Sequence, residues 1–291
     1  MPGTGSSWRA IGNETAGRVL DAVLLFRDAL YATLVIAVTC GVLGVWVVLR
    51  RIVFVGAALA QLSSAGIALA LLLAGAGLIS GPLAQPLLFA LVVSLLGAVA
   101  FGLGTRRGLI PPDATIGVTY AVAGAVGVLL IAKAAAGEAH DLYLHGNILG
   151  LTRRDTLLEL GVSIPVLLTH GLFYKEFLFV SFDPETARAV GYRVDRWNLL
   201  LYFTIGLVIA FAIQSAGVLL VFNFLVLPAV TGLLVARNMG GIFAVAIVAA
   251  ALAVGFGFVM SIPFDLPTGS AIIAASGLLV LLAWAARALR P

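Results

Sequence analysis

The sequence predicts an all-α, polytopic membrane protein with about nine transmembrane helices, in a range of roughly eight to ten. Three observations lead to this class. Hydrophobic residues make up 62% of the 291-residue chain and charged residues only 10%, whereas soluble proteins carry about 25% charged residues. The mean hydropathy is +1.15. Apolar runs of about 20 residues, long enough to cross the hydrocarbon core of a bilayer, recur along the chain.

Residues 1–27 are expected to form a polar tail, and residues 28–291 a transmembrane domain. Helix-ending signals separate the spans. Prolines at 111 and 112 stop one helix, because proline cannot continue one. Gln214, Ser215 and Gly217 divide a later apolar run that is too long for one span. The predicted spans are residues 29–49, 53–78, 85–103, 115–135, 156–173, two between 198 and 237, 241–260 and 270–286.

The distribution of Lys and Arg predicts the orientation. Nine spans divide the 17 basic residues into eleven on one side and six on the other. Cytoplasmic loops carry the excess of Lys and Arg. The N-terminus is therefore expected outside and the C-terminus in the cytoplasm. The net charge of +4 follows from this rule and does not imply a nucleic-acid partner.

The segment from Tyr174 to Trp197, YKEFLFVSFDPETARAVGYRVDRW, is unusually polar for this chain. It holds eight of the 30 charged residues and falls on the predicted cytoplasmic side. Asp183 is a good N-cap, and Pro184 suits the first helical position. Gly191 is a natural residue for the position after the helix. A helix of about two turns is unstable alone in water, so it is either a solvated loop or a docking helix for a soluble partner.

No enzymatic motif is present. The sequence lacks a nucleophile elbow, a helical H-E-x-x-H zinc motif and a Walker A loop, so the chain is not expected to be an enzyme or to hydrolyse ATP through a P-loop. Ionisable residues within the predicted spans are nearly absent. This argues against a proton-coupled secondary transporter, which relies on such groups.

Uncharged polar residues do lie within the predicted spans. They have two interpretations: hydrogen bonding between packed helices, or lining of a transport pathway. These residues are Gln61, Ser63, Ser64, Gln214 and Asn223.

An outer loop carries His140, Asp141 and His145. Imidazole and carboxylate groups suit borderline divalent metals. The cluster is either a metal-contacting mouth or a hydrated loop. His170 is expected to be an interfacial side chain.

Several motifs, in order, resemble the bacterial ABC-type zinc/manganese/iron permease family. The resemblance covers almost the whole chain, from about Phe26 to Leu282. The motifs are VVLRRIVFVGAALAQLSSAGIALALLL, LYLHGNILGLTRRD, FDPETARAVGYRV, AGVLLVFNFLVLPAVTGLL and SIPFDLPTGSAII.

The resemblance implies the membrane subunit of an ABC importer in the bacterial plasma (inner) membrane. A second permease copy would complete the pathway, and a cytosolic ATPase dimer would supply the energy. An extracytoplasmic binding protein would deliver a divalent metal ion as substrate, with no cofactor bound by this chain. The ATPase would dock on the charged segment, where the motif positions and their neighbours are Asp183, Glu185, Ala187, Arg188 and Gly191.

The chain departs from the family at the second span. The family pattern there reads Gly-Asp-x-x-x-His, but the corresponding residues are Ala57 and Gln61, and Ala65 replaces the following Pro. Both usual metal-contacting side chains are missing, and a neutral amide is a poor ligand beside imidazole or carboxylate. Two alternatives are therefore kept: a permease for a metal chelate or organic cofactor, and a non-transporting, degenerate subunit. Which metal is carried, and whether the permease is a homodimer or heterodimer, are left open.

Overall fold

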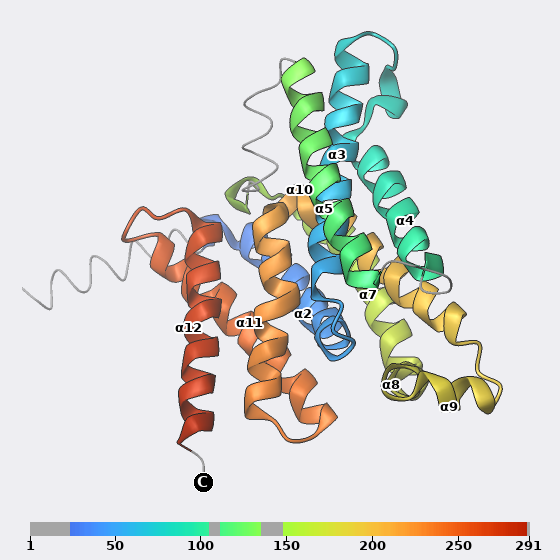
Figure 1. The fold of residues 1–291 in the computed structure, drawn as a ribbon. Helices are drawn as coiled ribbons and strands as arrows, with labels where there is room; N and C mark the ends of the chain where they lie inside the picture. Colours follow the sequence, from blue (N-terminus) through green and yellow to red (C-terminus); the bar gives the residue numbers. More distant parts are fainter. Residues whose placement is uncertain (1–23, 105–110, 135–147, 290–291) are drawn as a thin grey trace, which may run out of the picture.

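The structure is a computed structural model that describes residues 24–104, 111–134 and 148–289. Within these residues it is helical and contains no strand, as the sequence predicts. The long helices form one slanted bundle (Figure 1). They are α2 (Arg27–Leu49), α3 (Val53–Gly75), α4 (Pro86–Gly104), α5 (Pro112–Lys133), α7 (Arg153–Leu172), α10 (Val194–Val235), α11 (Met239–Ser261) and α12 (Thr268–Ala288).

Local signals explain where these helices begin. Pro112 is the first residue of α5, in agreement with the prediction that no helix passes through the proline pair. Thr152 and Asp155 form a capping box at the start of α7, in which the backbone N–H of Thr152 donates to Oδ2 of Asp155 at 2.8 Å. Asn238 caps α11 by accepting from the backbone N–H of Gly241 at 2.7 Å. Each cap satisfies donors that a helix leaves open at its first turn.

The described helices include seven that are long and apolar enough to cross a membrane, or up to eight if a bent pair is one span. That pair is α7 and α8 (Tyr174–Phe182), which meet at 68°. Helix α10, with 42 residues, is counted as one membrane span, although its backbone leaves the helical conformation at Gly217, with φ 77° and ψ 165°. The predicted division of this run is confirmed at Gly217, and the predicted count of nine is approximate.

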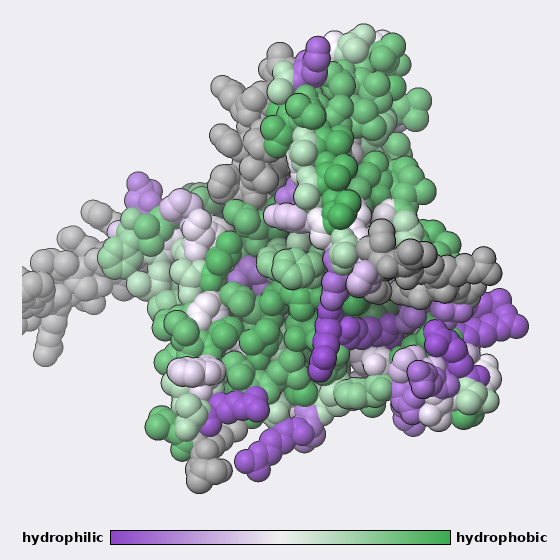
Figure 2. Space-filling model, viewed as in Figure 1, coloured by the Kyte–Doolittle hydropathy of each residue, from purple (hydrophilic) through white to green (hydrophobic). Residues whose placement is uncertain are grey.

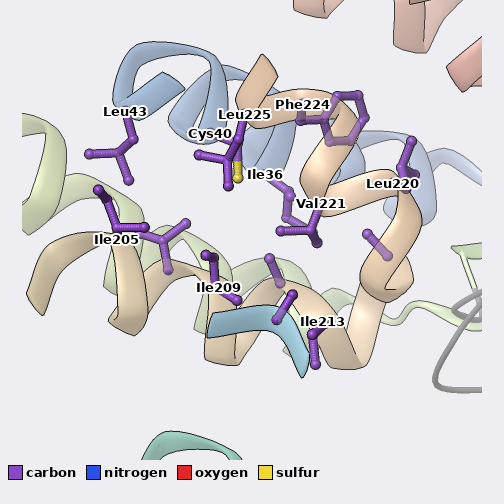
Figure 3. Packing of buried hydrophobic residues seen from close by; sticks show 14 of the residues in the cluster. Ile36, Cys40, Leu43, Ile205, Ile209, Ile213, Leu220, Val221, Phe224 and Leu225 are labelled. Atoms are coloured by element: carbon purple, nitrogen blue, oxygen red, sulfur yellow. The ribbon is translucent and has the colours of Figure 1, made fainter. Parts of the chain in front are cut away.

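The hydrophobic core lies where α2 packs between the two parts of the bent helix α10. Figure 3 shows the two limbs of α10 diverging, with Ile209 and Ile213 on one limb and Val221 and Phe224 on the other. Cys40 points into the space between the limbs (Figure 3) and is completely buried. Small residues allow this approach: a Cβ at Gly44 would overlap the backbone carbonyl of Leu225. Close packing over small residues is the usual way membrane helices associate.

Candidate functional site

The charged segment from Tyr174 to Trp197 forms two short helices, followed by the start of α10, at one end of the bundle. Figure 1 shows α8 and α9 (Pro184–Ala189) lying across the long helices, at the same end of the bundle as the last turn of α12. Hydrophilic side chains gather over this region, while most of the visible surface is hydrophobic (Figure 2). The side of the membrane that this end of the bundle faces stays a prediction.

Both ends of α9 have the predicted caps. Oδ1 of Asp183 accepts from the backbone N–H of Thr186 at 3.0 Å. Hydrogen bonds from Thr186, from its side chain and then its backbone, lower the pKa of the Asp183 carboxyl, so the cap is ionised at neutral pH.

At the other end Gly191 has φ 99°. Its N–H donates to the carbonyl of Arg188 at 3.0 Å, and the N–H of Tyr192 donates to that of Ala187 at 2.9 Å. These two bonds form a Schellman motif.

A small apolar cluster packs α9 against its neighbours. This packing stabilises a helix that is too short to be stable alone in water. Ala187 is fully buried and packs with Val180 of α8 and Val194 of α10. Phe179 and Tyr192 meet edge to face, with ring centroids 5.4 Å apart. The polar side chains of α9 are left on the outside: Asp183, Glu185 and Arg188 are exposed.

Arg50 connects this segment to the first span. It follows the last residue of α2, and its Nε donates to Oγ of Ser181 at 2.8 Å. Its Nη1 donates to Oδ1 of Asn198 at 2.6 Å. Burial lowers the pKa of Arg50 to about 10, so the guanidinium is still charged at neutral pH. Arg50 therefore bridges α2, α8 and α10 on both sides of α9.

The polar residues predicted for a pathway are dispersed. Gln61 is partly buried and faces α5, where a Cβ at Gly124 would lie 3.4 Å from its Oε1. Ser63 and Ser64 are buried in α3, and the Oγ of Ser63 has no hydrogen-bond partner among the residues that the structure describes. Gln214 is partly buried. Within the part of the chain that the structure describes, no side-chain hydrogen bond joins these four residues to one another.

Asn223 makes a hydrogen bond between two packed helices. Its Nδ2 donates to Oγ of Ser276 at 3.0 Å, and both side chains are buried. The bond joins α10 to α12, so this residue serves helix packing, one of the two interpretations given for it. Its Oδ1 is buried and has no hydrogen-bond partner in the described part of the chain.

The metal cluster predicted at His140, Asp141 and His145 lies outside the described residues. Among the residues that the structure does describe, no group of three or more His, Cys, Asp and Glu side chains is placed to hold a metal ion. Ala57 is buried, and Gln61 lies one turn further along the same helix. The second span thus offers no ionisable ligand at the positions where the family has two.

Two buried polar residues differ from the sequence-based expectation. His170 is not interfacial: it is 2% exposed, it stacks on Phe177 with ring centroids 4.4 Å apart, and its Nε2 lies 3.0 Å from Oγ1 of Thr204. Glu159 was overlooked, although it lies in the predicted fifth span. It is 3% exposed, and its Oε1 accepts from Oγ of Ser215 at 3.2 Å. The signal was present, since a carboxylate within an apolar run is unusual.

The fold is that of a multi-pass membrane protein with a short, capped helix, α9, at one end of the bundle. Residues 23–287 match the profile of the ABC 3 transport family. The chain belongs to this family, which confirms the resemblance seen in its motifs and places it among transporter membrane subunits, not enzymes.

Similar proteins span nearly the full length of the chain. It is 29% identical to the manganese transport system membrane protein MntC of Halalkalibacterium halodurans, over 89% of this chain and 86% of that protein. It is 30% identical to the manganese import system permease protein ScaB of Streptococcus gordonii, over 89% and 90%. Among solved structures, PsaBC from Streptococcus pneumoniae in complex with Fab is similar with a TM-score of 0.79 and 27% identity, over 92% of this chain and 95% of that one.

Proposed function

We propose that this chain is the membrane-spanning permease subunit of a bacterial ABC transporter that imports a divalent metal ion, with manganese as the first candidate. The observation that carries the proposal is the similarity to two manganese permease proteins over about nine tenths of each chain. Zinc and iron belong to the same proposal, because borderline and hard divalent ions share many ligands. The transporter would lie in the plasma membrane with its N-terminus outside.

A separate cytosolic ATPase dimer would supply the energy. The proposed docking surface is α9 with its exposed polar side chains Asp183, Glu185 and Arg188. Two apolar side chains beside it are also exposed, Phe182 at 63% and Val190 at 68%. A cleft of about 530 Å³ lies next to the helix and includes Glu176, Arg193 and Arg196 in its lining. Exposed apolar groups rimmed by charges are typical of a protein-binding surface.

The remaining partners follow from the importer class. An extracytoplasmic binding protein would deliver the ion at the side opposite α9. A second copy of the permease, most simply an identical one, would complete the pathway. The predicted cluster of His140, Asp141 and His145 would then lie at the mouth that receives the ion.

One observation favours a second candidate. Ala57 and Gln61 replace the two ligand-type residues of the family pattern, and a pathway without ionisable ligands there suits a metal chelate or an organic cofactor better than a bare ion. Import of such a compound is the alternative function. A degenerate, non-transporting subunit would show neither activity.

The test is uptake of radiolabelled manganese, zinc and iron by metal-importer-deficient bacteria. The cells express this chain together with a candidate ATPase subunit and a candidate binding protein from the same organism. We expect energy-dependent manganese uptake that is absent when the permease is omitted. A complex that assembles and hydrolyses ATP but takes up none of the three metals would contradict the proposal and favour the chelate or cofactor.

A further inference from the structure

Charges are separated along the surface that contains α9. Asp183 and Glu185 lie at the start of the helix, and both are exposed. Arg193 and Arg196 follow its end and are exposed as well. Within the part of the chain that the structure describes, no ion pair includes any of these four residues. The surface is therefore negative at one end of α9 and positive beyond the other.

The cleft of about 530 Å³ lies at the positive end. Arg193 and Arg196 contribute to its lining, and Glu176 is the acid among the lining residues that the structure describes. Arg188, in the last turn of α9, adds little to this charge, because its Nη2 lies 4.0 Å from Oδ1 of Asp195. The lining thus has an excess of positive charge that a partner has to match.

Contacts between aromatic rings hold the walls of the cleft in place. The ring of Trp197 meets Phe173 and Phe177 edge to face, with centroids 5.3 and 5.4 Å away. Tyr192 meets Phe179 in the same way at 5.4 Å. Edge-to-face contacts stabilise one orientation of each ring. The cleft is therefore formed before a partner binds, which lowers the entropic cost of binding.

The cleft is continuous with the proposed docking helix. Val190, Gly191 and Tyr192 directly follow α9, and all three contribute to the lining. A partner that covers α9 therefore also reaches the cleft. Its aromatic and arginine side chains are of the types that protein interfaces use as anchors. In the proposed function the partner on this surface is the ATPase.

We propose that the cleft receives an acidic side chain of the ATPase, which pairs with Arg193 and Arg196, and that basic side chains of the ATPase face Asp183 and Glu185. A guanidinium group can bind a carboxylate through two parallel hydrogen bonds. This inference rests on the proposed function and deepens it. Complementary charges at both ends determine the direction in which α9 lies on the ATPase.

Reversal of one charge at a time tests the cleft. In Arg193→Glu and in Arg196→Glu, the ATPase that co-purifies with the permease is expected to fall about tenfold or more, because like charges then face each other. Arg237→Glu is the control, since Arg237 is exposed and does not line the cleft; a change within about twofold is expected there. Undiminished ATPase in the first two variants, or an equal loss in all three, overturns the inference.

Salt dependence separates a direct charge pair from a folding defect. The dissociation constant of the wild-type complex should rise with salt, because salt screens exposed charges. The double variant Arg193→Gln with Arg196→Gln should bind more weakly at low salt and respond less steeply to added salt. A permease that is merely misfolded would lose affinity without this change in slope. Equal salt slopes for the wild type and the double variant overturn the inference.

A photoreactive amino acid in place of Val190 identifies the occupant of the cleft. Val190 is 68% exposed and contributes to the lining. The expected product is a crosslink to an ATPase peptide that has Asp or Glu within about one helical turn of the attachment point. A crosslink to phospholipid, or to a peptide without an acid, overturns the inference. A wild-type complex that gives the expected crosslink but imports no metal ion refutes the proposed metal import and supports the cleft as the ATPase contact.

Discussion

Arg50 Nη1 donates to Asn198 Oδ1 at 2.6 Å, and this bond joins the end of the first long helix to the start of α10. Its Nε binds Ser181 at the same time. The proposed docking helix α9 lies between Ser181 and Asn198 in the sequence. Arg50 therefore links the end of α2 to both flanks of the segment that contains α9.

Replacing Arg50 should uncouple the transporter. Arg50→Gln loses hydrogen bonds that, with a charged donor, contribute about 1.5–3 kcal/mol each. We expect ATP hydrolysis by the assembled complex to persist, while manganese uptake per ATP falls about threefold or more. Both rates are measured on the same membrane preparation.

Arg51 provides the control for this variant. It is the next residue, has the same charge and is exposed. Arg51→Gln should therefore leave uptake per ATP unchanged. An equal loss in both variants would show that charge near the membrane surface matters, and not the bridge made by Arg50.

Removing the cap of α9 should weaken binding of the ATPase. Asp183→Ala deletes the acceptor for the Thr186 backbone N–H, and loss of an N-cap costs about 1 kcal/mol. A loss of this size from the binding free energy weakens the affinity about fivefold. We therefore expect about fivefold less ATPase to co-purify with the permease. Undiminished co-purification would remove α9 from the docking surface.

Gly191→Val tests the other end of α9. No atom of the described residues outside its chain neighbours lies within 4 Å of a Cβ at this position, so the expected cost comes from the backbone conformation, φ 99°. Such backbone strain costs about 1–3 kcal/mol. We expect reduced ATPase co-purification with normal membrane insertion.

Gly77→Val is the matched control for Gly191→Val. Gly77 also has open space around it and a positive φ of 70°, but it lies in the connection after α3. Its substitution should strain the backbone without affecting ATPase binding. If both variants lower co-purification equally, general destabilisation is the cause.

The contact between α2 and α10 should be intolerant of a single methyl group. A Cβ at Gly44 would overlap the carbonyl oxygen of Leu225, whereas Gly117 in α5 has open space. Overpacking costs about 1–3 kcal/mol. Gly44→Ala is therefore expected to lower the thermal unfolding temperature in detergent, and Gly117→Ala to leave it unchanged or raise it. Equal unfolding temperatures would contradict the packing described for α2.

Much of the fold follows from the sequence because hydropathy and helix-ending residues act locally. The starts of α3 and α5, the caps of α9 at Asp183 and Gly191, and the break at Gly217 all depend on residues within a few positions. The tertiary contacts could not be predicted in this way. Arg50 bonds to Ser181 and to Asn198, which lie 131 and 148 positions further along the chain.

The candidate site was predicted less completely than the fold. Composition places Gln61 and Asn223 within spans but does not give the direction of a side chain, and only the fold shows Asn223 paired with Ser276. Glu159 was overlooked because a single acid in an apolar run has no local partner. Its hydroxyl partner lies 56 positions away, beside a break in another helix.

The most direct test of the metal-importer function is transport by the purified complex in liposomes. The permease is reconstituted with its ATPase, the binding protein is added outside, and ATP is enclosed. Radiolabelled manganese should accumulate inside with ATP and not with a non-hydrolysable analogue. A complex that hydrolyses the enclosed ATP without accumulating manganese, zinc or iron would contradict the account.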